Sequence, residues 1–303
     1  MKLENAAQSL APSYLATLAC HLEVTAPKPG NVHRGADFED VGLNDFLTSA
    51  VILGESLERN TSMTLGHTIF DCVDRNRVVV GSNTNLGIIL LLAPLVKVAQ
   101  QEPGREITPT LIEQYLQSLD GQDGRLTLEA IALAKPGGLG TAAEMDVNQD
   151  HQEVDLLDAM RVAEQRDAVA RMFVSGFADV FGQGLEWLEQ GRRLFPELSQ
   201  ANVYTHVRWM AEEPDSLIAR KCGADVAANS QRMARQAIDC LATGSANTAA
   251  SESERIEEFW RKVGELDFWL RSDGHRRNPG TTADLVTATL FVALYNRVLE
   301  PPF

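Results

Sequence analysis

The sequence predicts an all-α protein, a single multi-helix bundle domain of about eleven to thirteen helices spanning residues 1–303. Two observations support this prediction. Apolar residues recur at spacings of three and four along most of the chain, as they do in amphipathic helices. Convincing period-two alternation, which marks half-buried strands, is missing from the sequence.

The first helical segment leads into a loop rich in proline and glycine. Its apolar positions are Leu15, Leu18, Ala19 and Leu22. We expect the helix to end near Val24, because Pro27 and Pro29 push the residues before them out of the helical region. The backbone through Thr25 to Gly30 should therefore be extended or turning.

The same spacing continues along the rest of the chain. A second helix carries Phe46, Ala50, Val51, Leu53 and Leu57. Residues 156 to 180 form one long helical pattern, Ile256 to Trp269 a late helix, and Leu285 to Arg297 a last one. Short polar connections interrupt the pattern at residues 103–105 and 149–154, and residues 242–254 look like a surface loop.

Composition and charge narrow the class of protein. The chain has 27 basic and 42 acidic residues, a net charge of −15, which opposes nonspecific binding to nucleic acid or anionic lipid. The longest apolar runs are too short to span a bilayer, and no signal-like segment follows Met1, so we expect a cytoplasmic protein without a membrane partner. Four widely spaced cysteines fit neither a zinc site nor a disulfide framework. The sequence leaves a homo-oligomer open.

The segment from Glu23 to Asp40 is rich in charged and polar side chains. It supplies cations, amides and carboxylates from Lys28, Asn31, His33, Arg34, Asp37 and Asp40. A phosphorylated, metal-bound ligand would need such a set, although a solvated loop between helices is the simpler interpretation.

Four further loops each join a polar or glycine-rich turn to a helical segment. They are residues 81–87, 135–140, 214–221 and 278–284. A helix N-terminus offers free amide hydrogens and suits phosphate, but ordinary helix caps would look the same. Gly138 to Ala143 matches a dinucleotide-binding pattern, which we reject because the segment before it, Leu128 to Ala134, is helical rather than a strand.

Taken together, these loops resemble one family. The motifs are Glu23 with residues 27–31, Asn83-Thr84 with Gly87, Arg166-Asp167, Asp215 with Arg220, and residues 279–280 with 283–285. Their order resembles the ATP:dephospho-CoA triphosphoribosyltransferases, which make the prosthetic-group precursor of citrate lyase and malonate decarboxylase. The resemblance covers roughly residues 18–295 and implies an all-α fold. It also implies a reaction in which the 2′-hydroxyl of dephospho-CoA attacks the ribose C1 of ATP and adenine leaves.

The resemblance and this chemistry together assign candidate roles. The catalytic candidates are Glu23, Asp37 and Asp167, with Asp37 or Asp167 as the base and Glu23 as a competing assignment. The nucleotide-binding candidates are Lys28, Asn31, Arg34, Asn83, Thr84, Arg166, Arg220, Lys221, Gly280, Thr281 and Thr282. Asp215 and Asp284 are the candidates for Mg²⁺, which the triphosphate of ATP needs. We expect Lys28, Arg34, Arg166 and Arg220 to converge on one cleft.

Some features leave alternatives open. Asn85-Leu86 stands where the best-known members of the family have a His-Lys pair, and the 135–140 run also differs. The acceptor could therefore be another molecule, such as a pterin cofactor precursor. A noncatalytic nucleotide-binding protein is the second hypothesis. Arg166-Asp167 could be an exposed ion pair within a helix, and Asp284 could merely complement a helix dipole.

Overall fold

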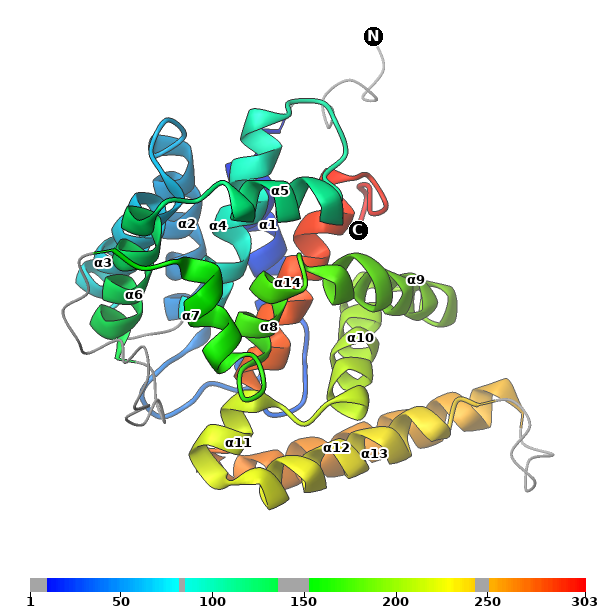
Figure 1. Cartoon of the computed structure of the whole chain (residues 1–303). Coiled ribbons are helices and arrows are strands. Elements are labelled where there is room, and N and C mark those ends of the chain that lie inside the picture. The colour runs from blue at the N-terminus through cyan, green and yellow to red at the C-terminus, as the bar shows by residue number, and fades with distance from the viewer. Residues whose placement is uncertain (1–9, 82–84, 136–152, 243–250) are drawn as a thin grey trace, which may run out of the picture.

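The computed structural model describes residues 10–81, 85–135, 153–242 and 251–303, and it confirms the all-α prediction (Figure 1). The first seven helices are α1 (Pro12–Thr25), α2 (Leu43–Arg59), α3 (Leu65–Val80), α4 (Leu86–Gln101), α5 (Pro109–Gln117), α6 (Gly121–Ala134) and α7 (Leu156–Ala163). The next are α8 (Ala168–Val174), the π-helix η3 (Val180–Gly184), α9 (Leu185–Leu194), α10 (Leu198–Glu212) and α11 (Ser216–Cys222). The chain continues through α12 (Ala224–Asp239), α13 (Glu252–Arg271), the four-residue extended segment β1 (Ser272–His275) and α14 (Gly280–Tyr295).

Helix α14 runs through the middle of the main bundle, in contact with α1, α4 and α8 (Figure 1). Its sequence is apolar on every face, and its side chains from Leu285 to Leu294 are buried. A helix that is apolar all round can satisfy its surface only in the interior. The hydroxyls of Thr287 and Thr289 donate to carbonyls four residues earlier, at 2.9 and 2.8 Å, so these two buried hydroxyls are satisfied within the helix.

A second hydrophobic cluster joins α10 to α13. Helices α12 and α13 lie side by side along the lower edge of the molecule (Figure 1). Phe195, Tyr204 and Phe259 pack their rings together inside this cluster. Helix α13 begins at a capping box made by Ser251 and Glu254. Its opposite end reaches the loop between α1 and α2.

The prediction of one long helical pattern from residue 156 to 180 was wrong. Helix α7 ends at Ala163, and Asp167 caps the new helix α8, so Arg166-Asp167 lies at a break rather than inside a helix. Gly176 and Phe177 then adopt positive φ angles of 61° and 62°, which a continuous α-helix cannot contain. This division brings the described residues to fourteen α-helices, one more than the upper limit of the predicted range.

Other boundaries agree with the sequence. Helix α1 ends at Thr25, next to the predicted Val24, and α6 occupies the helical segment that excluded a dinucleotide fold. No helix among the described residues is long and apolar enough to cross a membrane. All four cysteines are free; Cys20 and Cys72 are buried, and Cys222 and Cys240 are partly exposed.

Candidate functional site

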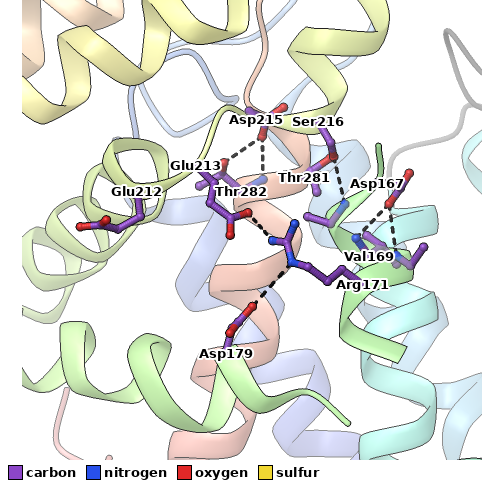
Figure 2. Close-up of polar contacts among 12 residues, drawn as sticks. Asp167, Val169, Arg171, Asp179, Glu212, Glu213, Asp215, Ser216, Thr281 and Thr282 are labelled. Carbon is purple, nitrogen blue, oxygen red and sulfur yellow. Dashed lines mark hydrogen bonds and ion pairs between the residues drawn. The ribbon is translucent and has the colours of Figure 1, made fainter. Parts of the chain in front are cut away.

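Three helices begin close together at one end of α14, and aspartates cap two of them (Figure 2). Asp167 caps α8 by accepting hydrogen bonds from the backbone nitrogens of Val169 and Ala170, at 2.9 and 3.3 Å. Asp215 caps α11 in the same way through Leu217 and Ile218, at 2.9 and 3.0 Å. Both aspartates precede helices whose first amides would otherwise lack partners, which explains these residue types.

Asp215 also binds the start of α14. Its second carboxylate oxygen accepts from the backbone nitrogen and the hydroxyl of Thr282, each at 2.8 Å (Figure 2). The Ser216 hydroxyl donates to that of Thr281 at 3.0 Å and accepts from the backbone nitrogen of Ala168 at 3.4 Å. The starts of α8, α11 and α14 are thereby connected by hydrogen bonds.

Asp284, in the first turns of α14, lies at the centre of an acidic group. Burial, followed by the charges of Glu23, Asp215 and Asp167, raises the pKa of the Asp284 carboxyl well above its ordinary value. The residue as a whole is partly exposed, although its carboxyl is surrounded by protein. No hydrogen bond or ion pair holds this carboxyl within the described part of the chain.

The carboxylate of Asp284 lies against the first turn of α4. A Cβ atom added to Gly87 would come within 2.0 Å of Asp284 Oδ2. Only glycine permits this approach, which gives Gly87 of the Asn83-Thr84-Gly87 motif a structural reason. A carboxylate beside a helix N-terminus is stabilised by the helix dipole. The start of α4 thus joins those of α8, α11 and α14 at the site.

Glu23 and Lys28 form a buried ion pair beside this group. Lys28 Nζ lies 3.0 Å from Glu23 Oε1 and also donates to the backbone carbonyls of Glu23 and Ala26. The Lys28 side chain is 0% exposed. Burial raises the pKa of Glu23 and lowers that of Lys28, and the attraction within the pair offsets both shifts in part. Sequence reasoning named both residues but did not pair them.

Arg220 forms an ion pair with Asp167. The side chains are 21% and 25% exposed, so the pair stands at the solvent edge of the site. Arg220 also lowers the pKa of Asp284, which acts against the surrounding carboxylates. Of the four carboxylates in the group, Glu23 and Asp167 therefore have a cation beside them. Asp215 and Asp284 have no cationic partner in the described part of the chain.

The loop after α1 is held against the end of α13. The backbone nitrogen of Gly30 donates to Asp267 at 2.7 Å, and Arg271 donates to the carbonyl of Asn31 at 2.6 Å. Asn31 Nδ2 donates to Asn278 Oδ1 at 2.5 Å. Sequence reasoning missed Asp267 and Arg271, although their i, i+4 spacing on a helix is a recognisable ion-pair signal.

The remaining candidates are not among the groups whose charges act on Asp284, or they lie outside the described residues. Arg34 and Arg166 are exposed, and Lys221 is partly exposed. Asp37 is exposed at the start of α2, where it accepts a hydrogen bond from Leu43 N at 2.7 Å. Asn83 and Thr84 fall outside the described residues. Four cations were expected to line one cleft. Arg220 lies beside the acidic group, Lys28 is buried in its pair with Glu23, and Arg34 and Arg166 are exposed.

The acidic group meets some of the requirements of a Mg²⁺ site. The described residues contain no group of three or more histidine, cysteine, aspartate or glutamate side chains that could hold a metal by themselves. Magnesium bound to a nucleotide needs only one or two protein carboxylates, because phosphates and water complete its shell. Asp284 fits this need, since its oxygens are uncommitted. Both oxygens of Asp215 already accept two hydrogen bonds each, so it fits less well.

Comparisons with known proteins point to one family. The sequence model of the family described as ATP:dephospho-CoA triphosphoribosyl transferase (CitG) matches residues 9–302. The fold is similar to a crystal structure of a proposed triphosphoribosyl-dephospho-CoA synthase from Archaeoglobus fulgidus. The two chains are 23% identical, the TM-score is 0.58, and the similarity covers 82% of this chain and 97% of the other. At this identity the likeness supports the fold alone. No curated protein sequence matches the chain.

Proposed function

The chain belongs to the ATP:dephospho-CoA triphosphoribosyl transferase family, and we propose that the acidic group around Asp284 is where its reaction takes place. The protein is a transferase of the triphosphoribosyl-dephospho-CoA synthase type. Such an enzyme moves the 5-triphosphoribosyl group of ATP to the 2′-hydroxyl of 3′-dephospho-CoA and releases adenine. ATP and dephospho-CoA are therefore the small-molecule substrates.

The bond changes define what the site must supply. A bond forms between the acceptor oxygen and the ribose C1 of ATP, and the bond from that carbon to adenine breaks with its electron pair moving to the base. The hydroxyl proton must be accepted, and the departing adenine must gain a proton. The sugar carbon carries positive charge at the transition state, which nearby carboxylates stabilise.

The unpaired carboxylates of Asp215 and Asp284 are the observation that carries the proposal. Neither forms an ion pair in the described part of the chain, and burial with the neighbouring carboxylates raises the pKa of Asp284 despite the opposing charge of Arg220. A divalent cation arriving with the triphosphate would relieve this repulsion, and Asp284 would hold it. Mg²⁺ supplies the positive charge that lets a triphosphate approach a protein of net charge −15.

Asp167 is the proposed base for the acceptor hydroxyl. It belongs to the group that surrounds Asp284 and is partly exposed, whereas Glu23 is fully enclosed with Lys28. Asp37 lies at the start of α2 and is not among the groups that act on Asp284. Arg220 stands beside Asp167, where it can also contact a phosphate of the bound nucleotide.

The start of α14 is the proposed place for part of the triphosphate. Gly280, Thr281 and Thr282 begin this helix, and Thr281 and Thr282 are buried. The backbone nitrogen and hydroxyl of Thr282 now donate to Asp215, so a phosphate could use them only by displacing that carboxylate. The exposed cations Arg34 and Arg166 and the partly exposed Lys221 remain candidates for the outer phosphates.

The deciding experiment is an adenine-release assay with ATP, dephospho-CoA and a magnesium titration, with the product identified by mass. We expect activity that requires all three components. Asp284→Asn should lower the rate at least about a hundredfold, which corresponds to roughly 2.7 kcal/mol. Asp158→Asn, an exposed aspartate on α7, is the matched control and should keep full activity. Near-normal activity of Asp284→Asn at every magnesium concentration would overturn the assignment of Asp284.

No observation favours the two alternatives, a different acceptor or a noncatalytic nucleotide-binding protein. The assay nevertheless separates them. Adenine release that does not depend on dephospho-CoA would show that water accepts the ribosyl group in its place, as expected of an enzyme with another natural acceptor, and ATP binding without release would indicate a binding protein. A cytoplasmic location belongs to the proposal, because ATP and CoA precursors are intracellular metabolites. Assembly into a homo-oligomer stays an expectation.

A further inference from the structure

A half-open pocket of about 270 Å³ lies between α3, α4 and α6, and its lining includes Leu86, the neighbour of Gly87. None of the described residues that line it is acidic. It therefore differs in character from the acidic group, and the proposed roles above do not use it. Its position next to Gly87 places it within about one helical turn, roughly 5.4 Å along the axis, of the Asp284 contact.

Apolar side chains from three helices form part of the pocket's walls. Val73 of α3, Leu86 and Ile89 of α4, and Leu133 of α6 contribute to them. Val73 and Ile89 belong to the main hydrophobic core, so these walls are held rigidly. Apolar walls bind a flat ring by burying its faces, and most small-molecule sites combine such walls with a few polar groups.

The polar groups of the pocket include both acceptors and donors. Helices α3 and α6 end there, at Gly81 and Lys135, and the last carbonyls of a helix lack intrahelical donors, so this region offers acceptors. Asn85 immediately precedes α4, is 4% exposed, and its side-chain oxygen has no hydrogen-bond partner among the described residues. A phosphate accepts hydrogen bonds, so a phosphate site needs donors and gains nothing from acceptors. A purine base with an exocyclic amine needs donors and acceptors together, and asparagine pairs well with the edge of adenine.

Cations stand at the mouth of the pocket. Arg77 and Lys135 line it, and both residues are exposed. Arg77 is also 3.7 Å from Asp74, but this is an exposed pair of the kind that contributes little and exchanges readily. Dephospho-CoA with its base inside the pocket would place its pyrophosphate near these cations, whereas ATP bound there would direct its triphosphate toward the start of α14.

We propose that this pocket binds the adenine base of a nucleotide substrate, with Asn85 pairing with the edge of the base. The proposal rests on the proposed function, which supplies two sources of the same base, ATP and dephospho-CoA. It adds a binding site and a residue that discriminates between bases. Hypoxanthine, which carries a carbonyl in place of the amine, should bind more weakly because the helix-end carbonyls would lose their donor.

The test measures binding without turnover. ATP, dephospho-CoA, free adenine and hypoxanthine are each titrated alone by calorimetry against the wild-type chain, Ala134→Leu and Asn85→Ala. Ala134 lines the pocket at the partly exposed end of α6, so a leucine there fills the space with little risk to folding. We expect both variants to weaken the binding of adenine at least tenfold. They should weaken by the same factor the binding of the one substrate whose base occupies the pocket. The substrate affected identifies the source.

The control is Val78→Ala on α3, whose side chain is 73% exposed outside the pocket, and it should leave every affinity unchanged. Thermal unfolding of each variant checks that the fold is intact. Affinities for ATP and for dephospho-CoA that both stay within twofold in a folded Ala134→Leu would overturn the proposal, as would equal binding of adenine and hypoxanthine. Failure of the proposed function would appear separately, as absence of adenine release in the catalytic assay, because these titrations need no turnover.

Discussion

The carboxylate of Asp215 accepts two hydrogen bonds from Thr282, one from its backbone nitrogen and one from its hydroxyl, each 2.8 Å long. The other oxygen of the same carboxylate caps α11. One side chain thus fixes the starts of two helices that are 64 residues apart at their first residues, Ser216 and Gly280. Burial raises the pKa of Asp215, and these hydrogen bonds offset part of the increase.

Asp215→Ala should therefore destabilise the fold by about 2 to 4 kcal/mol, because a helix cap is lost and a buried amide and hydroxyl lose their acceptor. Urea unfolding followed by circular dichroism measures this loss. Thr282→Val is the matched control, since it keeps the backbone bond and removes only the hydroxyl bond, for a cost of about 1 kcal/mol. A more stable Asp215→Ala would mean that repulsion among the carboxylates outweighs the capping bonds.

The raised pKa of Asp284 predicts a pH dependence of stability. A carboxyl whose pKa is higher in the folded state binds its proton more tightly there than in the unfolded chain. Its contribution is most favourable below the unfolded pKa of about 3.9 and declines as the pH rises through the folded pKa. Asp284→Asn should remove this decline, so its stability relative to wild type should increase from acidic to neutral pH.

Unfolding of both proteins in urea at several pH values measures the difference, and subtraction removes groups common to both. Millimolar Mg²⁺ with ATP should reduce the difference at neutral pH if the cation binds at Asp284. A difference that does not change with pH would show that the carboxyl titrates normally.

Gly30→Ala should be strongly destabilising. Gly30 has φ of 75°, and an added Cβ would lie 2.8 to 2.9 Å from atoms of Leu270 and Pro279. Gly104 has almost the same φ, 78°, but no atom lies within 4 Å of its Cβ position, so Gly104→Ala isolates the backbone cost. We expect about 1 to 2 kcal/mol for Gly104→Ala and a further 1 to 3 kcal/mol for Gly30→Ala. Equal losses in urea unfolding would indicate that the loop moves aside freely.

Arg220→Met should weaken the use of ATP. The substitution leaves Asp167 without its cation and removes one positive charge from the site. We expect KM for ATP to rise about tenfold or more, which corresponds to roughly 1.4 kcal/mol. Arg192→Met on α9, an exposed arginine, should leave KM unchanged. An unaltered KM in Arg220→Met would show that this arginine serves only to pair with Asp167.

Local sequence patterns predicted most of the helices, and they failed where an interaction between distant residues decides the outcome. The break between α7 and α8 depends on Asp167 acting as a cap and on the positive φ of Phe177, neither of which periodicity reveals. The ends of α1 and α3 were predictable because proline and glycine act on their immediate neighbours.

At the candidate site, too, local patterns were informative and long-range contacts were not predictable. Its acidic residues could be named from the sequence, but their partners could not. Lys28 pairs with Glu23 in the interior, and Asp215 holds Thr282 from 67 positions away. The approach of Asp284 to Gly87 depends on how α14 crosses α4, which no local pattern encodes. The roles of Asp37, Arg34 and Arg166 remain predictions.

The acidic group draws residues from α1, near the beginning of the chain, and from α14, near its end. The ribosome synthesises the chain from its N-terminus, so Glu23 and Lys28 leave the ribosome long before Asp284 is made. During that interval the buried surface of α1 has no α14 to cover it, and its charged pair lacks a finished interior. The newly made protein can therefore assemble the proposed nucleotide site only after synthesis is almost complete, and a transcript truncated before α14 would yield a chain without it.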